Sequence, residues 1–222
     1  ASIRNSTFID NYVGIYVGPN DYTPQEIIFS QTQGNTFEGS GSMKMPFSGQ
    51  SPVPEGLPYA GVFINYLSNF TFNAPGIGSS LPNDNKFINL NNGIVANQSN
   101  LSVIGSTFTD IANMGIFVNG NGHTMVQRGL GDGESYDPTF ENCNTGILSW
   151  RYNLDISRNN MKDVNTGISM VLSRNRQIDI YDNDIRNSQI GIRTYYNTPL
   201  DGSIRDNYLY FLNHPTDPDK GY

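Results

Sequence analysis

The sequence predicts an all-β fold, a solenoid of about eight coils with roughly 21 to 24 residues in each coil. The tripeptide Asn-Thr-Gly that begins at Asn144 recurs at Asn165, 21 residues later. Short β-branched and aromatic stretches alternate with Asn, Asp and Gly, and no long stretch has the 3.6-residue periodicity of a helix. Stacked coils explain this pattern, because one coil cannot bury its inner face alone.

The repeat can be followed through most of the chain. An apolar anchor residue is followed, six or seven positions later, by Gly and then Ile or Val. Phe37 pairs with Gly61 if residues 39–58 form an insertion, and Leu209 begins a last, incomplete copy. The regular pairs are Phe8 with Gly14, Phe87 with Gly93, Phe108 with Gly115, Phe140 with Gly146, Met161 with Gly167, and Ile185 with Gly191.

A second apolar position is expected five residues before each anchor. Thr32, Pro82 and Ser135 occupy this position in three coils and do not fit the apolar pattern. The residues that do fit are Ile3, Val103, Ile156, Ile180 and Ile204. Each coil therefore has room for three short strands and three turns, all within one domain that spans residues 1–222.

The motifs "IRNSTFIDNYVGIYV", "ISRNNMKDVNTGISM" and "IYDNDIRNSQIGIRT" resemble the right-handed parallel β-helix repeat family, the pectate-lyase-like superfamily. The resemblance covers nearly the whole chain and implies a right-handed parallel β-helix. It leaves function open, because that fold hosts lyases, hydrolases, epimerases, adhesins and phage spikes. A non-catalytic branch is favoured over a known enzyme family.

Equivalent positions should form columns when coils stack at the strand spacing of about 4.8 Å. The anchors then form one apolar stack along the axis. Two positions before the anchor, we expect an asparagine ladder in which each side-chain amide donates to the Asn of the neighbouring coil. Its members are Asn35, Asn85, Asn159, Asn183 and Asn207, with Ser6, Ser106 and Pro138 in the remaining coils.

A third column, two positions after the anchor, alternates amide and carboxylate side chains. Like charges one strand apart would repel, and the alternation separates every carboxylate by an amide. We interpret this column as structural. It contains Asn89, Asp110, Asn142, Asp163 and Asn187. In the outward column just before it, Lys162 can pair with Glu141.

Charge and composition exclude several classes of partner. The net charge of -7 is unsuited to nucleic acid, which normally requires a basic surface to neutralise phosphates. No apolar run is long enough to insert across a membrane. The single cysteine, Cys143, is expected to be buried as a small apolar residue. Because Ile3 already occupies a repeat position, we expect a segment of a longer β-helix or an assembly unit.

The enzyme motifs of the resembling family are incomplete in this chain. Asp182, Asp184 and Arg186 are the residue types that a calcium-dependent lyase uses, but both aspartates fall in a repeating turn. "GNGHTM", with His123, matches only part of the "GHG" motif of the hydrolases and lacks a carboxylate pair. We therefore predict no catalytic residues, while a divergent lyase or hydrolase remains an alternative.

A calcium site is the one metal site that the sequence offers. Asp132, Glu134 and Asp137 lie in the loop "GDGESYD", and carboxylate oxygens are ligands that Ca²⁺ prefers. The spacing is neither that of an EF-hand nor that of the glycine-rich nonapeptide repeat, so a solvated acidic loop is the preferred interpretation. No cofactor is predicted.

Aromatic residues at similar offsets in the later coils suggest a carbohydrate surface. Exposed aromatic rings can stack on sugars while neighbouring polar groups donate hydrogen bonds. The alternative is that these rings pack under loops or against another domain. The residues are Trp150, Arg151, Tyr152, Tyr195 and Tyr196. At another repeated offset, Tyr16, Phe63 and Phe117 are expected to be strand or core residues.

Insertions place the first-choice site on one loop-rich flank. The insertion after Phe37 and the long stretches after Gly61 and Gly115 exceed what a coil requires, and function often lies on such loops. The leading hypothesis is a secreted or cell-surface structural or adhesive module, for example in a bacterial extracellular appendage or large adhesin. Alternatives are a polysaccharide-cleaving enzyme and a non-catalytic carbohydrate-binding module. Expected partners are other domains or subunits of an extracellular assembly, or cell-surface polysaccharide.

Overall fold

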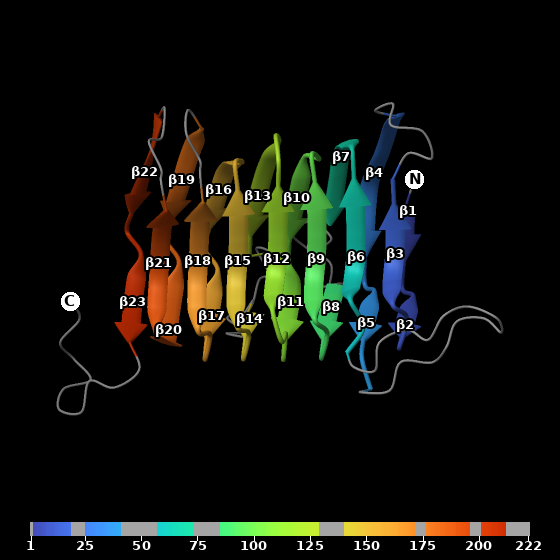
Figure 1. The fold of residues 1–222 in the computed structure, drawn as a ribbon, viewed down its shortest axis with the longest axis horizontal. Helices are drawn as coiled ribbons and strands as arrows, with labels where there is room; N and C mark the ends of the chain where they lie inside the picture. The colour runs from blue at the N-terminus through green and yellow to red at the C-terminus, as the bar shows by residue number, and fades with distance from the viewer. Residues whose placement is uncertain are drawn as a thin grey trace, which may run out of the picture.

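A computed structural model describes residues 2–18, 25–40, 57–72, 85–128, 140–171, 176–195 and 201–211. The described residues contain no helix and form three parallel sheets, which we name A, B and C. Consecutive strands of a coil enter different sheets, and each strand pairs with its counterpart in the neighbouring coils. The predicted parallel β-helix is confirmed, and Figure 1 shows the coils following one another along the long axis.

Each sheet takes one strand from each successive coil. Sheet A consists of β1 (Ser2–Arg4), β4 (Gln25–Gln33), β7 (Leu67–Phe72), β10 (Leu101–Ile104), β13 (His123–Gln127), β16 (Asn153–Ser157), β19 (Gln177–Tyr181) and β22 (Asp201–Arg205). Sheet B consists of β2 (Thr7–Ile9), β5 (Thr36–Glu38), β8 (Asn85–Ile88), β11 (Ser106–Thr109), β14 (Phe140–Glu141), β17 (Asn160–Lys162), β20 (Asp184–Ser188) and β23 (Tyr208–Phe211). Sheet C consists of β3 (Val13–Val17), β6 (Ala60–Asn65), β9 (Asn92–Asn97), β12 (Met114–Asn119), β15 (Thr145–Trp150), β18 (Thr166–Val171) and β21 (Ile190–Tyr195).

The anchor residues form the predicted apolar column inside sheet B. Strand register pairs every anchor with the next, from Phe8 at one end to Leu209 at the other. The phenylalanine rings stack face to face, with centroids 4.8 Å apart between Phe37 and Phe87 and 4.7 Å apart between Phe87 and Phe108. This spacing matches the strand spacing, so the backbone lattice itself sets the ring contacts.

The apolar column of sheet A corrects two sequence assignments. Phe72 and Val126, both buried, occupy the places that the alignment gave to Pro82 and Ser135. The extra residues of these coils follow the sheet A strand, and an alignment counted backwards from the sheet B anchor therefore skipped it. Thr32 does pair with Ile3 and Phe72, as the alignment required.

The repeated glycine before each Ile leaves space for the anchor stack. A Cβ atom on Gly115 would lie 2.7 Å from the carbonyl oxygen of Gly146 and 2.8 Å from a ring carbon of Phe140. The same clash occurs at Gly93, where a Cβ atom would lie 2.6 Å from the ring of Phe108. Each glycine therefore makes room for the anchor of the following coil.

The asparagine ladder is present in two stretches. In the later one, the Asn159 side-chain amide donates to Asn183 Oδ1 (3.0 Å), and that of Asn183 donates to Asn207 Oδ1 (2.9 Å). The Asn183 amide also donates to the backbone oxygens of Ile156 and Tyr181, at 2.9 and 3.1 Å. Asn35 donates in the same way to Asn85 (3.0 Å). The ladder thus satisfies buried turn carbonyls as well as its own amides.

A buried oxygen without a partner marks the break in the ladder. Asn159 Oδ1 is buried without a hydrogen-bond partner, although the equivalent oxygens of Asn85 and Asn183 each accept a backbone N–H from the preceding coil. The sequence alignment assigns the preceding position to Pro138, which lies outside the described residues, and proline has no backbone N–H to donate. Ser106 also interrupts the column, and its hydroxyl is buried without a partner.

The alternating Asn and Asp column lies at a left-handed turn. Asp110, Asn142 and Asp163 have φ values of 56°, 51° and 55°, a conformation that Asn and Asp tolerate better than most residues. The Asn142 amide donates to Asp110 (2.6 Å), and that of Asn187 donates to Asp163 (3.0 Å). The amide that separates two carboxylates thus also donates a hydrogen bond to one of them, which supports the interpretation of this column as structural.

Cys143 is buried beside Ile111 and Val164, in agreement with its predicted role as a small apolar residue. Burial raises the pKa of its thiol to about 12. The thiol therefore stays protonated near neutral pH and is a poor nucleophile.

We expect Asn183→Ala to lower the free energy of unfolding by about 3 kcal/mol, because it leaves several buried donors and acceptors unpaired. Asn165→Ala is the matched control. Asn165 is exposed and donates one side-chain hydrogen bond to Asn144, so we expect a loss below about 1 kcal/mol. Urea unfolding of both variants measures the difference, and equal losses would contradict a special role for the inner ladder.

Gly115→Ala should destabilise the protein by about 2 kcal/mol or more, since the new methyl group meets a backbone oxygen and a packed ring. Gly18→Ala serves as its control. Its nearest obstacle is the hydroxyl of the exposed Tyr16 side chain, at 3.2 Å, which can move aside. Thermal unfolding should show a lower midpoint for the first variant only, and a shift of similar size in both would overturn the packing argument.

Candidate functional site

The outer face of sheet C carries a line of apolar side chains. Outward residues alternate with the inward ones that fill the core, and strand register places them in one column across seven strands. The first five members, which we name the apolar stripe, are Tyr16, Phe63, Val95, Phe117 and Leu148. Ser169 and Arg193 complete the column. Val95, which is 2% exposed, and Ser169 are buried, whereas Tyr16 is exposed and Phe63, Phe117 and Leu148 are half-buried. Figure 1 shows sheet C toward the viewer.

Aromatic rings cluster at the first two coils of the stripe. The rings of Tyr16 and Phe63 stack with centroids 5.5 Å apart, and those of Tyr12 and Tyr59 stack at 5.6 Å. Tyr16 and Phe63 are strand residues, as expected, but they point outward, and Tyr16 is 63% exposed. Stacking along the axis covers the ring faces and leaves the ring edges toward solvent.

A second outward column runs along the end of the same strands. It consists of Asn65, Asn97, Asn119, Trp150, Val171 and Tyr195. Trp150 is 40% exposed and Tyr195 is 51% exposed. The two predicted aromatic residues therefore share one column and are separated by a single strand that contributes Val171.

The two outward columns of sheet C are nearly free of charge. Arg193 is the one charged residue among the members named above, although the chain contains 20 acidic residues. The outer faces of the other sheets differ. Sheet A exposes Asp179 and Arg205, and sheet B exposes the predicted ion pair of Lys162 with Glu141 (3.5 Å). Sheet C is thus the face best suited to an uncharged contact.

Tyr152 is not part of the exposed surface, which corrects its grouping with Trp150. Its side chain is fully buried, and its hydroxyl accepts a hydrogen bond from the Ser99 backbone N–H at 2.9 Å. Arg151 adopts a left-handed turn (φ 66°), which brings the next residue inward, and its side chain is exposed. Tyr196 lies outside the described residues.

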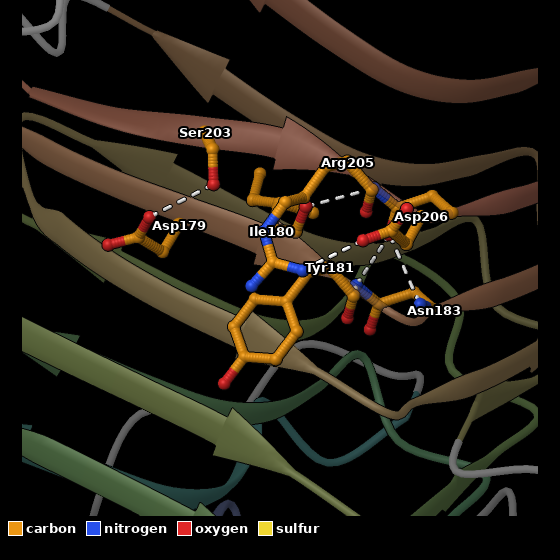
Figure 2. A network of polar contacts seen from close by, with 8 residues as sticks. Asp179, Ile180, Tyr181, Asn183, Ser203, Arg205 and Asp206 are labelled. Atoms are coloured by element: carbon orange, nitrogen blue, oxygen red, sulfur yellow. Dashed lines mark hydrogen bonds and ion pairs between the residues drawn. The ribbon is translucent and has the colours of Figure 1, made fainter.

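A polar network covers the outer face of sheet A in the last coils, as Figure 2 shows. Ser203 Oγ donates to Asp179 Oδ1 at 3.3 Å. The Arg205 guanidinium lies over the ring of Tyr181, 4.6 Å from its centroid, and pairs with Asp206 at 2.7 Å. The Ser203–Asp179 and Arg205–Tyr181 contacts join neighbouring coils across the surface, whereas the Arg205–Asp206 ion pair lies within one coil.

Sequence reasoning missed a pair of carboxylates on this face. Asp155 and Asp179 occupy the same register position on adjacent strands. Asp155 Oδ1 is buried without a hydrogen-bond partner, whereas Asp179 accepts from Gln177 and Ser203. The available signal was the repeated tripeptide apolar-Asp-Ile at residues 154–156 and 178–180. Among the described residues, no group of three or more His, Cys, Asp or Glu side chains could hold a metal ion.

The residue types of a calcium-dependent lyase do not come together as a site. Asp182 occupies a left-handed turn (φ 55°), as its place in the repeat predicted. Arg186 forms an ion pair with Asp184 at 2.6 Å, and this hydrogen bond raises the pKa of the guanidinium. A guanidinium held in its protonated form is unsuited to remove a proton from a substrate.

Other sequence predictions fall outside the described residues. Asp132, Glu134 and Asp137 of the acidic loop belong to residues 129–139, and most of the loop-rich flank belongs to 41–56 and 73–84. No helix in the part of the chain that the structure describes is long and apolar enough to cross a membrane.

Comparisons of this chain with protein-family models, with known proteins and with solved structures found no match. The candidate site is therefore defined by its own geometry.

Proposed function

We propose that this chain is a non-catalytic structural module of a secreted or cell-surface protein, and that it assembles by packing sheet C against another subunit. The observation that carries the proposal is the apolar stripe on an outer sheet face that is otherwise almost free of charge. Apolar side chains gathered on one outer face, here the exposed Tyr16 and the half-buried Phe63, Phe117 and Leu148, favour contact with another protein surface.

The internal ladders support the structural part of the proposal. Ring stacking along the anchor column and side-chain hydrogen bonds along the Asn column both run parallel to the axis. Interactions in this direction resist bending and separation of the coils. A molecule held together in this way is suited to act as a stiff spacer that presents contact surfaces at fixed distances.

We propose a second copy of this chain as the subunit that packs on the stripe. Two copies with a net charge of -7 each repel one another, and contact through an uncharged surface keeps carboxylates out of the interface, where their repulsion would be strongest. Sheet C provides such a surface, and two flat sheets pack face to face about 10 Å apart. Seven strands spaced at about 4.8 Å give a face of roughly 500 Å² in projection. Side chains that project from the sheet make its accessible area larger than this projected area. The accessible area thus approaches the roughly 800 Å² that each partner buries in a standard interface.

Phe117→Lys tests this assembly, because it places a charge in the middle of the stripe. We expect the wild-type protein to be a dimer by light scattering and the variant to be a monomer at the same concentration, since an unpaired buried ammonium is strongly unfavourable. Thr107→Lys, on the outer face of sheet B, is the matched control and should remain dimeric. A wild-type protein that stays monomeric at about 100 μM, a concentration far above the Kd of a stable dimer, would contradict the proposal.

Cleavage of polysaccharide is a second candidate, favoured by the adjacent carboxylates of Asp155 and Asp179. Retaining glycosidases place two carboxyl groups about 5 Å apart, close to the strand spacing that separates these residues. The structural proposal predicts that the wild-type protein releases no reducing ends from polysaccharides. Release that falls about 100-fold in Asp179→Asn but stays unchanged in Asp163→Asn, which alters a turn, would establish the enzyme instead.

A further inference from the structure

Three asparagines of this chain, Asn92, Asn119 and Asn121, are followed directly by glycine. An asparagine in this position can react with its own backbone, because the nitrogen of the next residue can attack the side-chain carbonyl carbon. Glycine favours the attack, since it adds no side chain in the path of the reacting atoms and leaves the backbone free to approach. The structure places the three pairs in different surroundings, and these surroundings decide which pair can react.

Hydrogen bonds hold two of the three pairs in place. Asn92 is 2% exposed, and its side-chain amide donates to the Tyr59 carbonyl oxygen at 2.9 Å. After Asn119, the Gly120 N–H donates to the Trp150 carbonyl oxygen of the next coil at 3.0 Å. The first side chain is thus enclosed in the turn, and the second pair lacks a free attacking nitrogen.

The third pair lies on the turn between β12 and β13, where Asn121 is exposed. Among the described residues, none accepts a hydrogen bond from the Gly122 N–H, although the Gly122 carbonyl oxygen accepts from the Asn153 N–H at 3.0 Å. Packing also requires glycine at this position, because a Cβ atom on Gly122 would lie 2.6 Å from the ring of Tyr152. The fold therefore keeps a reactive pair at the surface of this turn.

Arg176 reaches Asn121 from two coils further along the axis. The strands β13, β16 and β19 follow one another in sheet A, and Arg176 directly precedes β19. Its Nη2 donates to the side-chain oxygen of Asn121. In the part of the chain that the structure describes, no carboxylate forms an ion pair with Arg176. A cation bonded to this oxygen draws electrons from the carbonyl carbon and stabilises the negative charge that attack places on the oxygen.

We propose that Asn121 is a site of spontaneous deamidation, and that Arg176 accelerates the reaction. The Gly122 nitrogen loses its proton to hydroxide and attacks Asn121 Cγ, which forms a cyclic succinimide. The bond between Cγ and the side-chain nitrogen breaks, and that nitrogen takes a proton from water and leaves as ammonia. Water then opens the ring at either of its carbonyl carbons and leaves aspartate or isoaspartate at position 121.

The modification changes how the two coils are joined. It replaces the neutral acceptor of Arg176 with a carboxylate, and a charge-assisted hydrogen bond is stronger than one to an amide. The new ion pair joins coils that are not neighbours in sheet A, since β16 lies between them. It also makes the chain one unit more negative than its net charge of -7. The inference concerns a turn outside the apolar stripe and does not depend on dimer formation.

Peptide mapping by mass spectrometry tests the site, because all three asparagines lie in one tryptic peptide, residues 87–128. The full chain is incubated at mildly alkaline pH, and fragmentation locates the exchange of the amide NH₂ for OH. We expect Asn121 to convert while Asn92 and Asn119 remain amides. In urea, where the folded contacts are lost, Asn119 and Asn121 should convert at similar rates. Folded protein in which Asn121 stays intact, or converts no faster than Asn119, would overturn the proposal.

Arg176→Gln tests the role of the guanidinium. We expect deamidation of Asn121 to slow about fivefold, the effect of one hydrogen bond on a rate. Arg151→Gln is the matched control, because Arg151 is exposed on the turn of the coil between them, and its loss should leave the rate unchanged. Unchanged or faster deamidation in Arg176→Gln, or equal slowing in both variants, would contradict a specific action of Arg176.

Asn121→Gln checks that the product arises at this position. The variant keeps the amide but lengthens the side chain by one methylene, which makes ring closure by the Gly122 nitrogen much slower. Labelling of isoaspartate by a specific methyltransferase should therefore fall to background in the folded variant. Labelling that persists at the wild-type level would show that the modified residue lies elsewhere in the chain, against the proposal.

Discussion

Stacking of the coils in register is the constraint on which the rest of this structure depends. Each coil lies one strand spacing from the next, so every side chain has a neighbour of the same position above and below it. At the inward positions, stability therefore favours residue types that pack or hydrogen-bond with copies of themselves. Phenylalanine meets this condition through stacked rings and asparagine through its amide and oxygen, which explains why these residues fill the anchor and ladder columns.

The same constraint explains which features the sequence could predict. The anchor stack, the inner Asn ladder and the Asn/Asp turn column lie within two residues of one another in each coil. Counting residues from the anchor was therefore sufficient to predict all three columns. Phe72 and Val126 were missed because extra residues separate their strands from the anchors. The burial of Tyr152 was missed for a different reason. Whether a side chain after a turn points inward depends on the φ angle of Arg151, and the offset of an aromatic residue does not reveal it.

Contacts within the outward columns are harder to predict from the sequence, because packing in the core imposes no residue type on outward positions. Asp155 and Asp179 differ from their register neighbours Met125 and Ser203, so the repeated apolar-Asp-Ile tripeptide was their one signal in the sequence, and the register was needed to establish the pairing. The same freedom allows the three outer faces to differ in charge. Sheets A and B use it for polar networks that join the coils, and sheet C uses it for an apolar stripe that has no such network.

Aromatic residues on sheet C differ in whether another ring covers them, and the number of coils between them decides it. Rings on adjacent strands, such as Tyr16 and Phe63, stack on one another and turn their edges outward, which suits packing against another protein surface. Trp150 and Tyr195 lie on alternate strands with Val171 between them, so the register gives them no stacking contact with each other. The spacing of the coils thus determines which outward rings can stack, in the same way that it determines the contacts of the anchor column.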